Sequence, residues 1–288
     1  MTWVSNSYAK INLGLHVLER LPTGFHRIET GFCFLEWSDR IESRKSESYS
    51  LTLSDSDIPD GESNLITRAY RIFEKYAGLK SEYRFHVQKR IPAGAGLGGG
   101  SSNAARTLQM LNRMENAGLS NDDLVDLSRT LGSDIAFFIH GHTGIGTGLG
   151  QEIEAVDLQP DAWIVTVWPG FESSTAEAYL HCTPNPQPVL NLKTILTEEP
   201  LSEWPILLQN DLEQAVIPLH ETVGNLKDQM NEFGAVYSSM SGSGSAVFGL
   251  FDQDFVALHA YDAFHDLGFR THITRPGFRP DHGIYLKE

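Results

Sequence analysis

The feature that most constrains the fold of this chain is a glycine-rich segment, PAGAGLGGGSSNAA, at residues 92–105. Five of the seven residues from 94 to 100 are glycine, and glycine loses more backbone entropy on folding than any other residue. This density indicates a backbone that takes positive φ repeatedly or lies within van der Waals distance of a bulky group. A phosphate chain is the obvious bulky group, because an ordinary turn rarely needs more than about one or two glycines.

The residues on either side of this segment predict the secondary structure that an anion site requires. Apolar and polar residues alternate from Tyr83 to Ile91, which is typical of a β-strand. Apolar residues then recur at helical spacing from Ala104 to Leu111, and we expect Ser101 or Ser102 to be the N-cap of this helix. A strand, a glycine loop and a helix N-terminus in this order bring free N–H groups and the positive end of a helix dipole together.

Two well-known phosphate-binding patterns can be compared with the loop, and neither fits. A G-x-G-x-x-G match through Gly94, Gly96 and Gly99 has no acidic residue at the end of a following strand about 20 positions on, where a dinucleotide fold needs one. The Walker A pattern requires Lys and then Ser or Thr after its last glycine, whereas Gly100 and Ser101 stand here. A phosphate loop without its own lysine must obtain positive charge from elsewhere in the chain.

Length and charge restrict the class of protein. A chain of 288 residues exceeds the usual size of one domain, so we expect two. A net charge of −15 argues against nucleic-acid or anionic-membrane partners. The two cysteines, Cys33 and Cys182, form neither a disulfide framework nor a CxxC motif. Because we find no signal segment and no apolar run of about 18 residues, we expect a cytoplasmic protein whose oligomeric state the sequence leaves open.

The start of the chain predicts a long hairpin followed by a helix. Residues 8–18 alternate in polarity, which places Lys10 and Asn12 on the same polar face of one strand. A turn at residues 21–24 then returns the chain into a second apolar run. Residues 64–78 have a helical pattern that begins with Asn and ends with Gly, the residue most suited to a helix C-terminus.

Periodicity is lost near residues 151–160, where we place a domain boundary. We therefore expect an N-terminal domain over residues 1–155 and a C-terminal domain over residues 156–288. The second domain contains predicted helices and strands between residues 221 and 271, interrupted by an SGSGS turn at residues 241–245. This pattern predicts an α+β layer, an antiparallel sheet with helices on one face.

Two charged residues are candidates for phosphoryl transfer to an alcohol. That reaction needs a cradle for a triphosphate, positive charge on the developing oxygens and a carboxylate that receives the hydroxyl proton. Asp134 follows a helix predicted to end at Gly132, and an isolated Asp at such a junction is most simply an N-cap. Lys10 taken alone would be a solvated lysine on a strand. Together they would supply a base and a cation that neither supplies singly.

Two histidines are candidates for metal ligands. His140 and His142 stand two apart in a predicted strand and would therefore share one face. No third ligand is evident, so we expect surface or packing histidines and no metal site built from protein ligands. The chain also contains no G-x-S-x-G elbow and no H-E-x-x-H pattern.

Three separated motifs resemble those of the GHMP small-molecule kinases. They are AKINL at residues 9–13, the glycine loop at residues 91–105 and MSGSG at residues 240–244. Four further segments resemble the branch of that family that phosphorylates 4-diphosphocytidyl-2-C-methyl-D-erythritol. These segments are GFH at 24–26, NLI at 64–66, LGSD at 131–134 and NDLE at 210–213.

The resemblance implies a two-domain α+β fold, with a ribosomal-protein-S5-like α/β domain followed by a ferredoxin-like α+β domain. It also implies ATP-dependent phosphorylation of the 2-hydroxyl of that cytidylyl alcohol, in the non-mevalonate pathway to isoprenoid precursors. Asp134 would be the general base, Lys10 its cationic partner, and residues 241–245 would close over the cleft. The alternatives are a homoserine-type or mevalonate-type GHMP kinase and a catalytically silent nucleotide-binding regulator.

The resemblance also assigns the binding residues. Asn64 and Lys89 would lie near the nucleotide, and Mg²⁺ would come with ATP, held mainly by phosphate oxygens and water with help from Ser102. The phosphates would lie on Pro92, Gly94, Gly96, Gly98, Gly99, Gly100, Ser101 and Ser102.

The alcohol would be recognised by residues outside the glycine loop. Asn12 would hold the methylerythritol hydroxyls, while Phe25 and His26 would recognise cytosine, one by stacking and one by hydrogen bonding. Phe25 stands where the family usually has Tyr, which preserves the ring and removes a hydroxyl. Residues 172–205 have no clear counterpart in the family, so Tyr179 is only a candidate for a second aromatic ring on the cytosine.

Overall fold

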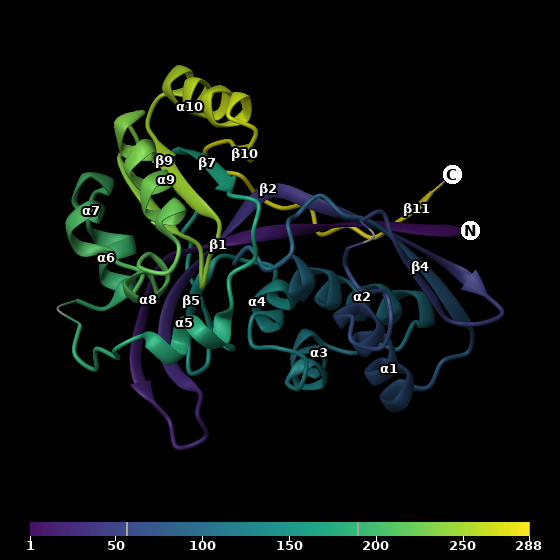
Figure 1. Cartoon of the computed structure of the whole chain (residues 1–288). Coiled ribbons are helices and arrows are strands. Elements are labelled where there is room, and N and C mark those ends of the chain that lie inside the picture. The colour runs from purple at the N-terminus through teal and green to yellow at the C-terminus, as the bar shows by residue number, and fades with distance from the viewer. Residues whose placement is uncertain (56, 189, 288) are drawn as a thin grey trace.

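The structure is a computed structural model that describes residues 1–55, 57–188 and 190–287. It contains two β-sheets with helices packed against them, and Figure 1 shows a long strand pair that runs across the whole molecule. The α+β class expected from the sequence is confirmed. None of the helices in the described residues is both long enough and apolar enough to span a bilayer.

The hairpin predicted at the start of the chain is formed by β1 (Thr2–Arg20) and β2 (His26–Ser46). Ile11 and Leu13, on one face of β1, are fully buried, as the alternating pattern predicts. Lys10 on the opposite face is also buried, at 3% exposure. The hairpin therefore has no solvated face here, because the N-terminal and C-terminal parts of the chain pack on opposite sides of it.

The N-terminal sheet has the strand order β11-β1-β2-β4-β3, and β5 and β6 extend it from β2. Figure 1 shows its helices gathered on one face. Stacked rings fill the space between the sheet and these helices, with Phe137 4.8 Å from Phe32 and 4.4 Å from Phe34. The elements of this part are β3 (Ser50–Leu53), α1 (Leu65–Ala77), β4 (Glu82–Gln88), α2 (Gly99–Glu115), α3 (Asn121–Ser128), α4 (Ile135–His140), β5 (Gly144–Thr147) and β6 (Glu152–Ala155).

The C-terminal sheet has the order β10-β7-β9-β8, and all its neighbouring strands are antiparallel. Helices α9 and α10 bury Met230 and Phe264 against it, which confirms the predicted layer. Shorter helices lie between β7 and α9 and flank the hairpin. The elements are β7 (Trp163–Trp168), α5 (Thr175–His181), α6 (Leu192–Glu198), η1 (Leu201–Glu203), α7 (Trp204–Leu207), α8 (Glu213–Val216), α9 (Glu221–Glu232), β8 (Tyr237–Met240), β9 (Val247–Phe251), α10 (Asp254–Asp266) and β10 (Arg270–Thr274).

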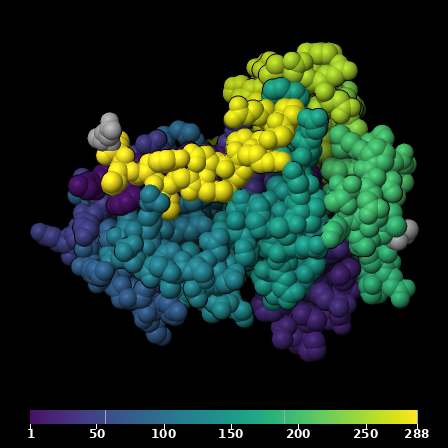
Figure 2. All heavy atoms as spheres, turned by 180° about the vertical axis from the view of Figure 1, so that it is seen from behind, coloured from purple at the N-terminus to yellow at the C-terminus, as the bar shows by residue number. Residues whose placement is uncertain are grey.

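The end of the chain returns to the N-terminal sheet, which the sequence analysis missed. Strand β11 (Tyr285–Lys287) pairs with residues 2–4 of β1. Figure 2 shows the C-terminal segment, in yellow, lying along the surface of the N-terminal part. The first sheet therefore contains strands from both sides of the boundary expected between residues 155 and 156.

Three local predictions are wrong. Neither Ser101 nor Ser102 is the N-cap of α2, because the helix begins at Gly99 and the left-handed Gly98 precedes it. Helix α3 opens with the predicted capping box at Ser120 and Asp123, but it ends at Ser128, before Gly132.

The third correction concerns the two histidines, which do not share a strand. His140 is the last residue of α4, and His142 follows the left-handed Gly141 that ends the helix. The two rings stack on each other with centroids 5.6 Å apart. The apolar run at residues 135–139 therefore forms a buried helix whose first turn starts directly after Asp134.

Candidate active site

The glycine loop has the backbone that its composition predicts. Gly94, Gly96 and Gly98 have φ values of +57°, +75° and +68°. A Cβ added at Gly96 would lie 2.0 Å from the carbonyl oxygen of Ser241, and one at Gly98 would lie 2.8 Å from the Phe138 ring. The bulky groups that approach these glycines are thus parts of the protein itself. The loop is clamped between α4 and the turn that follows β8.

The N-terminus of α2 leaves its N–H groups available to a ligand. Its N-cap, Gly98, has no side chain, and the first N–H groups of a helix have no acceptor within the helix. A serine N-cap would have used one of these donors. Because glycine stands there instead, the donors and the positive end of the helix dipole face the cavity that residues 98–101 line. The wrong N-cap prediction therefore strengthens the expectation of an anion site.

A cavity of about 470 Å³ lies against this helix terminus. Its walls come from β1, from the glycine loop, from the start of α4 and from the turn after β8. Ten of the residues proposed from the sequence line it, namely Lys10, Asn12, Pro92, Gly94, Gly96, Gly98, Gly99, Gly100, Ser101 and Asp134.

Lys10 and Asp134 meet in this cavity although 123 residues separate them in the chain. The Lys10 Nζ lies 3.4 Å from the Asp134 Oδ2. Burial lowers the pKa of Lys10 below its ordinary value, and the nearby carboxylate of Asp134 opposes that shift. Lys10 is therefore a buried cation with a partner, not the solvated strand lysine that it would be if it stood alone.

The Asp134 side chain does not cap its helix. Asp134 occupies the N-cap position of α4, but its side chain makes no capping hydrogen bond. The side chain is 32% exposed and lines the cavity. Its carboxylate consequently stays available to accept a proton from a ligand hydroxyl.

Asn12 fixes the direction of the Lys10 side chain. Its Oδ1 accepts a hydrogen bond of 2.5 Å from the Lys10 Nζ, and its Nδ2 donates to the Thr30 Oγ1 at 2.8 Å. The Thr30 hydroxyl in turn donates to the carbonyl of Gly14 at 2.7 Å. This chain of bonds leaves one N–H of the Asn12 amide for the predicted contact with substrate hydroxyls.

The turn after β8 closes one side of the cavity. The Ser241 Oγ donates to the carbonyl of Gly96 at 2.9 Å. Asn210 fixes this turn, because its Nδ2 donates to the carbonyls of Met240 and Gly242, both at 2.8 Å. Asn210 belongs to the NDLE segment that resembles the family, but no role for it was evident from the sequence.

A second cavity of about 1030 Å³ adjoins the first and is lined by different kinds of group. Phe25, at the tip of the hairpin, is 63% exposed. His26 is buried and stacks on Tyr179, with ring centroids 5.1 Å apart and an interplanar angle of 22°. The two cavities share the lining residues Ser133, Leu149, Thr175 and Tyr179.

Burial determines the protonation of this aromatic pair. It lowers the pKa of His26, and the positive charge of Arg20 lowers that pKa further. Burial also raises the pKa of Tyr179. His26 is thus a neutral ring with one donor and one acceptor at neutral pH.

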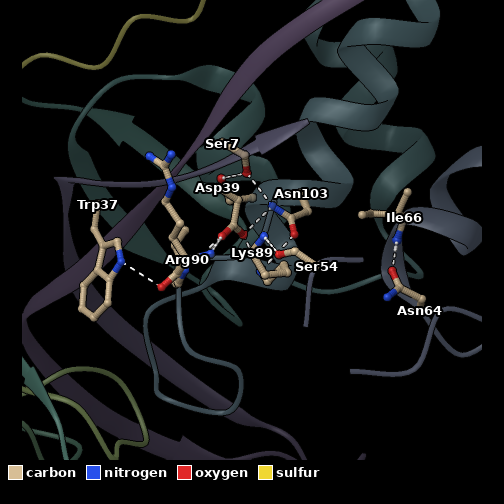
Figure 3. A network of polar contacts seen from close by, with 11 residues as sticks. Ser7, Trp37, Asp39, Ser54, Asn64, Ile66, Lys89, Arg90 and Asn103 are labelled. Carbon is tan, nitrogen blue, oxygen red and sulfur yellow. Dashed lines mark hydrogen bonds and ion pairs between the residues drawn. The ribbon is translucent and has the colours of Figure 1, made fainter. Parts of the chain in front are cut away.

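Three predicted binding residues do not line either cavity. Asn64 is the N-cap of α1, where its Oδ1 accepts the N–H of Ile66 at 2.9 Å. Ser102 is buried and accepts a hydrogen bond from the Ser7 Oγ at 2.8 Å. The Lys89 ammonium lies 3.5 Å from the position of a Cβ on Gly99. It forms an ion pair with the buried Asp39 (Figure 3).

Comparison with known proteins agrees with this geometry. The family models described as "GHMP kinases N terminal domain" and "GHMP kinases C terminal" match residues 64–142 and 196–268. The 4-diphosphocytidyl-2-C-methyl-D-erythritol kinase of Chlorobium limicola is 39% identical over 277 residues, covering 94% of this chain and 96% of that protein. The Cytophaga hutchinsonii kinase of the same name is 40% identical over 255 residues, covering 86% and 92%.

Solved structures give the same result. A crystal structure of 4-(cytidine 5'-diphospho)-2C-methyl-D-erythritol kinase is 31% identical, with a TM-score of 0.79, and the match covers 94% of this chain and 98% of that one. The homoserine kinase of Cytophaga hutchinsonii, at 14% identity and a TM-score of 0.71 over 97% and 98%, shares the fold. The chain therefore belongs to the GHMP kinases and, within them, to the family of the 4-diphosphocytidyl-2-C-methyl-D-erythritol kinases.

Proposed function

We propose that this chain transfers the γ-phosphoryl group of ATP to the 2-hydroxyl of 4-diphosphocytidyl-2-C-methyl-D-erythritol. The observation that carries the proposal is the pairing of Lys10 with Asp134 in a cavity that also contains the N-terminus of α2. The same cavity thus combines a helix terminus that can hold phosphate groups with a carboxylate and a cation, and Lys10 lies directly beside the glycine loop, where its N–H donates to the carbonyl of Leu97 at 3.0 Å. The sequence relatives named for this reaction span nearly the whole chain.

The residues divide the reaction into three tasks. The Asp134 carboxylate takes the proton of the alcohol hydroxyl while the hydroxyl oxygen bonds to the γ-phosphorus of ATP. The bond between that phosphorus and the bridging oxygen breaks, and ADP leaves. The Lys10 ammonium, 3.4 Å from that carboxylate, stabilises the negative charge that develops on the attacking oxygen. The N–H groups at the start of α2 stabilise the phosphate oxygens.

Magnesium fits this site as an ion that the phosphates bring with them. Among the described residues, no group of three or more His, Cys, Asp or Glu side chains could hold a metal ion. Phosphate oxygens and water would therefore supply most of its ligands. The Ser102 hydroxyl, which the sequence suggested as a further ligand, is buried and lines neither cavity. The ion would neutralise charge on the transferring group.

The second cavity has the groups that recognition of a base requires. An exposed ring at Phe25 offers a stacking surface, and the neutral ring of His26 offers hydrogen bonds. Tyr179 backs His26 and borders both cavities, which makes it the candidate for a second ring on the cytosine. A base in this cavity would place a linked alcohol near Asp134, because Ser133 lines both spaces.

The proposal is tested by turnover with ATP and three alcohols: the cytidylyl methylerythritol, homoserine and mevalonate. We expect product from the first only. Asp134→Asn should lower kcat by about a hundredfold or more while ATP still binds. Asp254→Asn, which makes the same change in the first turn of α10, is the control and should leave kcat unchanged.

Each other outcome contradicts a stated part of the proposal. Phosphorylation of homoserine or mevalonate instead would assign the chain to another alcohol. ATP binding without any product would indicate a silent nucleotide-binding regulator. A loss of only about twofold in Asp134→Asn would show that Asp134 is not the general base.

A further inference from the structure

One completely buried carboxylate accepts hydrogen bonds from residues at both ends of the glycine loop. Asp39 lies in β2 with 0% exposure. Its Oδ1 accepts the backbone N–H groups of Arg90 and Ile91 at 2.7 and 2.9 Å. Its Oδ2 accepts hydrogen bonds from the Lys89 ammonium and from the Asn103 Nδ2, the latter at 2.9 Å. Figure 3 shows Asp39 at the centre of this network.

The partners of Asp39 stand at both ends of the glycine loop. Residues 89–91 lead from β4 into the loop, and Asn103 lies at the start of α2, where the loop has ended. The loop itself contacts the cavity between these points. One carboxylate therefore sets the distance between the end of β4 and the helix terminus that we propose binds phosphate.

The network continues from Asn103 toward the cavity. The Asn103 Nδ2 also donates to the Ser7 Oγ at 2.8 Å, and Ser7 donates to the Ser102 Oγ at 2.8 Å. Ser7 lies in β1, the strand that also carries Lys10. The same set of bonds thus joins the helix terminus to the strand that positions the catalytic cation.

The chemistry of this position requires a carboxylate. An ionised carboxylate only accepts hydrogen bonds and has about four sites for them, and four donors surround Asp39. An asparagine would turn an NH₂ group toward one pair of these donors, and it would leave the buried Lys89 without its counter-ion. The substitution therefore changes the network at both ends of the loop while altering the shape of the side chain little.

We propose that Asp39 is a positioning residue for nucleotide binding. It holds the two ends of the glycine loop at a fixed distance from each other. The proposal rests on the proposed function of that loop as the ATP site. Asp39 lines neither cavity, so its replacement should weaken ATP binding without changing the affinity for the alcohol.

The test compares Asp39→Asn with Glu115→Gln in the full chain. Glu115 is a matched control because it is a buried carboxylate at the far end of the same helix α2. It accepts hydrogen bonds from the Lys80 N–H at 3.1 Å and from the Tyr83 hydroxyl at 2.5 Å. Both variants lose a buried charge, and both are expected to lower the unfolding temperature.

We expect Asp39→Asn to raise the Kd and the KM for ATP about tenfold, since small misplacements of a binding group are costly. The KM for the alcohol and kcat at saturating ATP should stay within about twofold of the wild type, and Glu115→Gln should change none of these constants. The proposal is overturned if Asp39→Asn binds ATP like the wild type, or if both variants weaken ATP equally.

A milder variant keeps the proposal testable if Asp39→Asn does not fold. Asn103→Ala keeps the Asp39 carboxylate paired with the Lys89 ammonium, but it removes the Asn103 bonds to Asp39 and Ser7 and the one that the Asn103 Oδ1 accepts from Lys89. A rise of about threefold in the Kd for ATP is expected. An unchanged Kd would contradict the proposal. Binding of ATP by the wild type without turnover would instead contradict the proposed function and leave the Asp39 comparison valid.

Discussion

The two cavities differ in the kind of residue that lines them. The smaller one is lined by seven glycines, which offer only backbone, and those at 96 and 98 approach the turn after β8 and α4. The larger one is lined by side chains, including the 63% exposed Phe25 at the hairpin tip. A backbone site cannot change without disturbing the packing around it, whereas side chains at a tip can be exchanged at little cost. We therefore expect related kinases to share the phosphate site and to differ in the side chains that recognise the alcohol.

The largest effect is expected from one methyl group added to the glycine loop. In Gly96→Ala the new Cβ would lie 2.0 Å from the carbonyl oxygen of Ser241, so the loop and the turn must separate. We expect kcat/KM to fall on the order of a hundredfold. The free energy of unfolding should fall by about 2–5 kcal/mol, from positive-φ strain and overpacking together. Steady-state kinetics and urea unfolding measure the two effects.

Gly118→Ala is the matched control for this change. Gly118 has φ +72°, close to the +75° of Gly96, but a Cβ there would meet no atom within 4 Å. The control should lose only about 1–2 kcal/mol of stability and no activity. Equal losses of activity in the two variants would show that strain alone matters and that contact between the loop and the turn does not.

A substitution in the second cavity should change the KM for the alcohol and leave the KM for ATP unchanged. His26→Ala removes a hydrogen-bonding ring from the second cavity without touching the loop. We expect the KM for the cytidylyl alcohol to rise about tenfold, and the preference over a uridylyl analogue to shrink. The KM for ATP should not change. Kinetics with each substrate varied in turn measure the effect.

His181→Ala provides the comparison variant. His181 is an exposed histidine at the end of α5, the helix that carries Tyr179, and it does not line the second cavity. Its removal should leave both KM values unchanged. If His26→Ala also leaves the KM for the cytidylyl alcohol unchanged, His26 does not recognise the base.

Local signals predicted much of the fold because they act over a few residues. Asn64 and Gly78 delimit α1 as expected, since N-cap and C-cap bonds form within one turn of the helix. Ser120 and Asp123 form the predicted capping box for the same reason. Strand β11 was missed because it has three exposed residues and gains its order only by pairing with the start of β1.

The site was predictable only where a motif marks the residue. Lys10 and Asp134 could be proposed singly from composition and position, but their distance of 3.4 Å depends on packing between β1 and α4. Asp39 gave no signal of its own, because its hydrogen bonds reach residues at least 50 positions away. Asn210 lies in a recognised motif, but its bonds to the turn after β8 join residues 30 and 32 positions away and could not be read from that motif. The use of Ser102 as an acceptor for Ser7 is likewise set by tertiary contact.

The smallest effect that separates the two cavities is a dependence on pH. Burial and the charge of Arg20 lower the pKa of His26 from its ordinary 6.5, so protonation of the ring requires a lower pH than for a free histidine. Protonation removes the acceptor nitrogen of the ring. The KM for the cytidylyl alcohol should therefore rise as the pH falls, with the midpoint of the rise below pH 6.5.

The KM for ATP should show no such rise, because the backbone N–H groups that line its cavity do not titrate in this range. Arg20→Gln should move the onset of the rise slightly toward higher pH, since burial is the larger cause of the shift and remains in place. The measurement is the KM for each substrate at half-unit steps of pH. A midpoint above pH 6.5 in the wild type would mean that the pKa of His26 is raised, which contradicts the lowering that burial and Arg20 cause.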